Sequence, residues 1–165
     1  MRRVMRRLSA LVFTAFVFIG CSGTSGGGTT PPAPTTSQLQ RAASGIQTLQ
    51  GRYNSSTGLY STTGWWNSAN ATTVLVDYAQ VSNSTQYNSV LANTFTAAQK
   101  TSLNFLNNYY DDEGWWALAW IDAYDLTGNQ QYLSMAETIF SDMAGGWDTT
   151  CSGGVIVDGE RPPLR

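Results

Sequence analysis

Histidine is absent from this chain of 165 residues, and charged residues make up only 12% of it. Without an imidazole, neither a Ser-His-Asp triad nor a Cys-His pair can form, and a zinc site is not expected. The chain also lacks the glycine-rich loops that bind nucleotide phosphates and the acidic loop that binds calcium. Carboxylates and aromatic side chains remain as the groups for chemistry, so we expect no metal and no cofactor.

Basic residues are scarce outside the N-terminus. Of nine lysines and arginines, four are Arg2, Arg3, Arg6 and Arg7. The rest of the chain carries five basic and eleven acidic residues, a net charge of about −6. Nucleic acids and anionic lipid headgroups are bound by basic patches. We therefore expect neither as a partner of the folded part of the protein.

The N-terminus reads as an export signal. In MRRVMRRLSALVFTAFVFIGC, arginines are followed by an apolar run over residues 11–19, which is too short to span a bilayer, and by Gly20. The last four letters resemble the bacterial lipobox, although Phe18 stands where leucine is usual. We expect residues 1–20 to be a lipoprotein signal peptide, with Cys21 lipidated as the membrane anchor of an exported protein of the bacterial cell envelope. A secretory peptide cut elsewhere is the alternative.

A flexible tether is expected over residues 21–38. Its SGTSGGGTTPPAPTTSQ stretch has no large apolar side chain, so little burial would offset the entropy of ordering it. The folded domain is then predicted over residues 39–154. Residues 155–165 read as a disordered tail, as expected of a truncated chain. With Cys21 lipidated, Cys151 has no partner for a disulfide within the chain.

From Leu39 onward the apolar residues recur with the period of an α-helix. In YLSMAETIFSDM they fall at i, i+3, i+4, i+7, i+8 and i+11, counted from Tyr132. Similar patterns predict about five helices, over residues 39–49, 71–81, 91–106, 116–123 and 132–143. We therefore expect an all-α fold.

Two segments of the sequence repeat. TGWWNSAN at 63–70 is echoed by EGWWALAW at 113–120, and DYAQVSNSTQY at 77–87 by DAYDLTGNQQY at 122–132. In the second echo, Gly128 suits the left-handed position that ends a helix, and Asn129 suits the N-cap of the next. Repeated helical hairpins bury their faces only by stacking or by closing into a ring. The pattern predicts an α-solenoid that serves as a binding scaffold, or a barrel of paired helices.

Three segments resemble glycoside hydrolase family 76, the α-1,6-mannanases: YYDDEGWWALAWIDAYDLTGNQQYL, GLYSTTGWWNSANATTVLVDY and GGWDTTCSGG. The similarity covers roughly residues 40–154. It implies a partial (α/α)6 barrel with about five of twelve helices, and retaining hydrolysis of α-1,6-mannosidic linkages in mannan. By this resemblance, Asp111 is the nucleophile and Asp112 the acid/base. The activity of a chain holding part of the barrel is left open.

The adjacent carboxylates fit that chemistry on physical grounds. A retaining glycosidase holds its two carboxyl groups roughly 5–5.5 Å apart. Neighbouring residues in a loop or at a helix start can present such a pair, whereas one face of a regular helix cannot, since successive side chains diverge. The alternative is structural: the two aspartates cap a helix, with Glu113 in its first turn favouring the helix dipole.

Aromatic and amide side chains near the pair are the candidates for sugar binding. Aromatic rings offer flat apolar faces to sugar rings, and amides offer hydrogen bonds to hydroxyl groups. The candidates are Trp65, Trp66, Asn67, Asn70, Trp115 and Trp116. In each tryptophan pair we expect one ring to line the site and the other to lie in the core. The two asparagines have cap and turn roles as alternatives.

Two functions from different classes therefore stand. The first is an α-1,6-mannanase-like glycoside hydrolase that acts on α-mannan or a related polysaccharide. The alternative is a non-catalytic helical-repeat lipoprotein that binds glycans or proteins.

Overall fold

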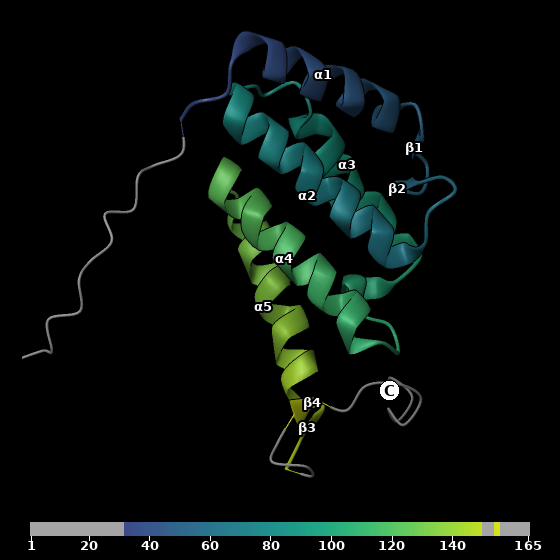
Figure 1. The fold of residues 1–165 in the computed structure, drawn as a ribbon. Helices are drawn as coiled ribbons and strands as arrows, with labels where there is room; N and C mark the ends of the chain where they lie inside the picture. The colour runs from purple at the N-terminus through teal and green to yellow at the C-terminus, as the bar shows by residue number, and fades with distance from the viewer. Residues whose placement is uncertain (1–31, 150–153, 156–165) are drawn as a thin grey trace, which may run out of the picture. The chain divides into compact units, whose positions relative to one another are not determined.

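The computed structural model describes residues 32–149 and 154–155. Within them lie five α-helices: α1 (Thr36–Gln50), α2 (Trp65–Ser82), α3 (Asn88–Ala97), α4 (Tyr110–Thr127) and α5 (Gln130–Ala144) (Figure 1). Two short 3-10 helices, η1 (Ala98–Lys100) and η2 (Leu103–Phe105), follow α3. Two two-stranded antiparallel ladders complete this part of the chain, β1 (Tyr53–Asn54) with β2 (Leu59–Tyr60), and β3 (Trp147–Asp148) with β4 (Gly154–Val155). The all-α prediction is confirmed.

Several predicted features lie outside the described residues. They are the signal peptide, Cys21 with its lipid, most of the tether, Cys151 and nearly all of the tail. Among the described residues, no helix has the length and apolar character needed to cross a membrane.

The first helix begins earlier than its apolar pattern indicates. Thr35 and Gln38 form a capping box: the Gln38 N–H donates to Thr35 Oγ1 at 3.3 Å, and the Thr35 N–H donates to Gln38 Oε1 at 2.7 Å. Such a box satisfies two N–H groups at a helix start. Residues 36–38 therefore belong to α1 and not to the tether, a boundary set by polar caps rather than by Leu39.

The second sequence echo corresponds to two matching helix ends. α2 ends at Asn83 (φ 51°) and α4 at Gly128 (φ 69°), both in the left-handed conformation. The Asn129 side chain then accepts the Gln131 N–H at 3.1 Å and caps α5. The turn chemistry predicted at Gly128 and Asn129 is confirmed.

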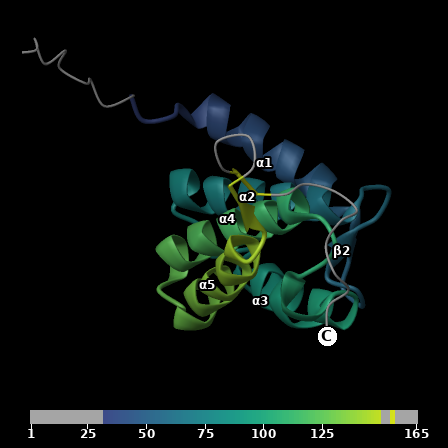
Figure 2. The same cartoon turned by 90° about the horizontal axis from the view of Figure 1, so that it is seen from below.

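Helices α2 and α4 pack side by side, α1 packs against α2, and α5 packs against α4. Seen from below, α2 and α4 lie next to each other between α1 and α5 (Figure 2). The tryptophans that open both sequence repeats meet at one end of this α2–α4 pair, so the two helices run in the same direction.

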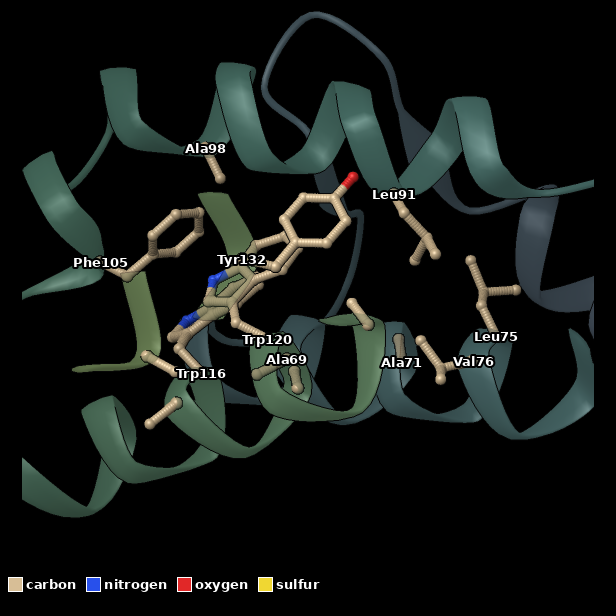
Figure 3. Close-up of a cluster of buried hydrophobic side chains, with 14 of the residues drawn as sticks. Ala69, Ala71, Leu75, Val76, Leu91, Ala98, Phe105, Trp116, Trp120 and Tyr132 are labelled. Atoms are coloured by element: carbon tan, nitrogen blue, oxygen red, sulfur yellow. The ribbon is translucent and has the colours of Figure 1, made fainter. Parts of the chain in front are cut away.

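The core is built around aromatic rings at this junction. Phe105, Trp116, Trp120 and Tyr132 are buried and cluster together (Figure 3). The Phe105 centroid lies 4.8 Å from that of Trp116 and 5.0 Å from that of Trp120. Phe105 has φ 61°, which is unfavourable for a bulky residue. Its burial offsets that cost and fixes the loop that leads into α4.

Candidate active site

The two aspartates lie within the first turn of α4. The N-cap is Tyr109, whose side chain makes no capping hydrogen bond, and Tyr110 is the first helical residue. Neither Asp111 nor Asp112 is therefore the N-cap of α4, so the capping role considered as an alternative to catalysis is wrong. Carboxylates in a first helical turn interact favourably with the helix dipole, by roughly 0.3–1 kcal/mol each. This position offsets part of their mutual repulsion.

The three acidic side chains of this turn have different surroundings. Asp111 is exposed, Asp112 is half-buried and Glu113 is buried. Successive side chains of an α-helix point about 100° apart, so this series turns from solvent into the core. Asp111 and Asp112 are thus not equivalent, which a division of labour between nucleophile and acid/base requires.

Asn107, in the loop before α4, connects to two of these acidic groups. Its backbone N–H donates to Glu113 Oε1 at 2.8 Å, and its side-chain Nδ2 donates to Asp112 Oδ2 at 2.9 Å. Its Oδ1 accepts the Tyr109 N–H at 2.7 Å. Sequence reasoning assigned no role to Asn107, because an asparagine five residues before an aspartate matches no local motif.

The tryptophans divide into an inner and an outer pair. Trp65 and Trp116 meet with ring centroids 5.0 Å apart, Trp65 half-buried and Trp116 without exposed surface. Trp66 and Trp115 stack at 6.4 Å with 29° between their planes, and are 41% and 43% exposed. Each repeat therefore supplies one exposed ring and one ring that packs inward. Trp116, which was predicted to bind sugar, lies in the core and has no exposed surface. Trp65 is half-buried and contributes mainly to packing.

Both candidate asparagines on α2 bind backbone groups of their own helix. Asn67 Oδ1 accepts the Gly64 N–H at 2.9 Å, and Asn70 Nδ2 donates to the Trp66 carbonyl at 3.3 Å. The capping role is therefore the one that the structure shows for Asn67. Asn70 holds the turn that carries Trp66.

A groove of about 580 Å³ runs between α4 and α5 and includes Asp111. Trp115, Leu118 and Ile121 line it from α4. Leu133, Phe140 and Met143 line it from α5. The described residues contain no group of three or more Cys, Asp or Glu side chains placed to hold a metal ion. The chemistry available at this end of α4 is that of carboxylates, amides and exposed indole rings.

Comparison with known proteins identifies the family. The model of glycosyl hydrolase family 76 matches residues 36–158. No curated protein sequence matches the chain.

Solved structures share the fold at low identity. The α-1,6-mannanase GH76A from Salegentibacter sp. HEL1_6 superposes with a TM-score of 0.66 and 21% identity, over 74% of this chain and 39% of that one. An inactive variant of that enzyme, with two consecutive aspartates replaced by alanine and α-1,6-mannotetrose bound, gives a TM-score of 0.63 at 20% identity, over 71% and 37% of the chains. The Lin0763 protein from Listeria innocua gives 0.62 at 20%, over 72% and 39%.

The present chain thus spans about two fifths of the length of these proteins. Its described residues form part of a helical (α/α)6 barrel, as the resemblance predicted, whereas the hairpin repeats alone had left an α-solenoid open. Because the family model covers most of the sequence, the chain belongs to glycosyl hydrolase family 76.

Proposed function

We propose that this chain carries the catalytic pair of a retaining glycoside hydrolase that cleaves α-1,6-mannosidic linkages in mannan. The observation that carries the proposal is the pair of non-equivalent carboxylates in the first turn of α4, one turn from an exposed tryptophan pair. Family membership supports the reaction class. The Salegentibacter enzyme, whose inactive variants have two consecutive aspartates replaced, supports the substrate and the paired residues.

In this mechanism the Asp111 carboxylate attacks the anomeric carbon while Asp112 gives its proton to the departing glycosidic oxygen. The C–O bond of the linkage breaks, and a covalent mannosyl ester forms on Asp111. Asp112, now ionised, takes a proton from water, whose oxygen attacks the anomeric carbon; the ester bond to Asp111 breaks, and the sugar chain leaves with retained configuration. The exposed faces of Trp66 and Trp115 support the sugar chain.

Hydrolysis of α-1,6-mannan by the wild type and two variants tests the proposal. Asp111→Asn and Asp112→Asn should each lower the rate about 10³-fold or more, since either loss raises the barrier by several kcal/mol. Substantial hydrolysis by both variants would contradict the catalytic assignment. Binding of mannan by a wild-type chain that releases no sugar would favour the non-catalytic binding lipoprotein instead.

We also propose that residues 1–20 are removed and that Cys21 is acylated, which would hold the protein in the bacterial cell envelope. The basic and apolar leader that ends in FIGC supports this anchor. Mass spectrometry of the membrane fraction should find Cys21 with acyl mass as the first residue. A different N-terminus without acyl mass would contradict it.

A further inference from the structure

We propose that Asn107 is a positioning residue for the reaction: it holds the carboxyl group of Asp112 in place from the loop before α4, with Glu113 as its anchor. The proposal rests on the proposed function, in which Asp112 is the acid/base. It adds a residue outside the Asp-Asp-Glu turn, and a defined task for the buried third acid of that turn.

The direction of the contact to Asp112 follows from a neighbouring hydrogen bond. The Tyr109 N–H can only donate, so the Asn107 atom that it contacts at 2.7 Å is the carbonyl Oδ1. The amide Nδ2 must then face Asp112 Oδ2, at 2.9 Å. A flipped amide would lose both bonds. Its NH₂ group would then face the Tyr109 N–H, and its carbonyl oxygen would face the Asp112 carboxyl oxygen. Asn107 is therefore fixed as a donor to Asp112.

The backbone of Asn107 is held independently of its side chain. Its N–H donates to Glu113 Oε1 at 2.8 Å, and Glu113 is fully buried beside the core. Two residues earlier, Phe105 lies in the aromatic cluster. The loop is thus tied at both ends, and the Asn107 amide has little freedom to leave Asp112.

Such a contact affects both the place and the proton affinity of an acid/base. Proton transfer requires hydrogen-bond reach, and a misplacement of about 1 Å can cost roughly 10²-fold in rate. An amide that donates to a carboxylate also favours its ionised form. Removing the amide should therefore lower the rate of the protonation step and move the titration of Asp112 to higher pH.

The first arm of the test does not need activity. In the full chain with ¹³C-labelled aspartate, the Asp112 carboxyl signal is identified by its loss in Asp112→Asn and followed against pH. We expect it to titrate at higher pH in Asn107→Ala, and to stay unchanged in Asn108→Ala, the exposed neighbour that serves as the matched control. An unchanged titration in a folded Asn107→Ala protein would overturn the proposal.

If Asn107→Ala does not fold, the titration of Asp112 is measured in Asn107→Asp instead. It keeps the shape of the side chain, but when ionised it has no proton to donate and adds a negative charge beside Asp112. The titration of Asp112 should then move to still higher pH. No movement in this variant would overturn the proposal equally.

The second arm measures hydrolysis. Asn107→Ala should lower kcat on α-1,6-mannan about 10- to 100-fold with little change in KM, and should lower it far less on a mannoside with a good leaving group, which needs little protonation. A purely structural defect would reduce both substrates alike, and that result would overturn the proposal while the proposed function stands. A wild-type chain that cleaves no mannan would overturn the proposed function, and with it the catalytic task of Asn107, whatever the titration shows.

Discussion

At the scale of single residues, Trp66 and Trp115 come from different helices and stack on the surface, and Trp115 lies one helical turn beyond Asp111 on α4. Their partners in sequence, Trp65 and Trp116, pack against Phe105 in the interior. Neighbouring tryptophans of one motif thus divide between the surface and the core. This division gives the two kinds of ring opposite expected effects on binding and on stability.

Replacing Trp66 or Trp115 by alanine should weaken binding of α-1,6-mannotriose roughly tenfold, or about 1.4 kcal/mol, with little change in thermal stability. The reason is that each exposed ring offers a face to sugar but little packing to the fold. Trp116→Ala is the matched control, and it should cost about 3–5 kcal/mol of stability because the ring is fully buried. Calorimetric titration and thermal unfolding measure the two effects. Unaltered binding by both surface variants would rule out a role of these two rings in sugar binding.

The sequence could show that each tryptophan pair has one inner ring, but not which one. Aligning the repeats matches Trp65 with Trp115, although Trp65 packs inward and Trp115 faces outward. Gly64 is the N-cap of α2, whereas its counterpart Gly114 lies inside α4, which begins four residues earlier and also packs against α5. Tertiary neighbours decide such orientations, and a local repeat does not contain them.

At the scale of secondary-structure elements, the parallel packing of α2 and α4 brings two equivalent aspartates of the repeat near each other. Asp77 lies on α2 and Asp122 on α4. Burial raises the pKa of Asp122 above its usual value, and the negative charges of Asp77 and Asp125 raise it further. A carboxyl group whose pKa is higher in the folded state binds its proton more tightly there than in the unfolded chain. The folded state therefore loses stability as the pH rises through the titration range of that group.

Asp122→Asn should therefore raise the midpoint of thermal unfolding at pH 7, and the gain should vanish at about pH 3, where the Asp122 carboxyl group is protonated. The effect should be small because the group is partly exposed to solvent. Asp77→Asn should give a gain of the same sign. The double variant should gain less than the sum, since either change removes the same repulsion. A loss of stability at pH 7 in Asp122→Asn would contradict this account.

Four of the helices and the turn at Gly128 were predictable, because apolar period and turn chemistry are local properties. The helix predicted over residues 91–106 was wrong beyond Ala97, where α3 gives way to the two 3-10 helices. The loop that leads into α4 was not predictable. Asn104 and Phe105 adopt left-handed conformations there, and the Phe105 ring packs in the aromatic cluster, which the local sequence does not reveal. Asn107 reaches Asp112 and Glu113 by hydrogen bonds that depend on this path of the backbone. The sequence thus singled out the two aspartates but not Asn107, which binds Asp112.

At the scale of the whole chain, the groove between α4 and α5 presents a continuous apolar surface. Leu118 and Phe140, from opposite sides of it, are both exposed to more than half of their full area, at 53% and 69%. Contiguous apolar patches of this kind bind apolar molecules. The protein spans about two fifths of the Salegentibacter mannanase that it matches.

An apolar fluorescent dye should bind this groove. Leu118→Ser and Phe140→Ser should each reduce the dye fluorescence of the folded protein, because they place hydroxyl groups where the dye contacts alkyl or aromatic surface. Leu103→Ser is the matched control, since Leu103 is 72% exposed but lies outside the groove. An equal reduction in all three variants would mean that the dye does not bind in this groove.

Trapping of the covalent intermediate tests the central claim, the division of roles between Asp111 and Asp112, most directly. The Asp112→Asn variant is incubated with an activated α-mannosyl substrate whose leaving group needs no proton, then digested and analysed by mass spectrometry. The ester should form but turn over slowly, because no carboxylate remains to activate water. The account predicts one mannosyl unit on the peptide, bound to Asp111. A mannosyl unit on another residue, or release of inverted product without any adduct, would contradict it.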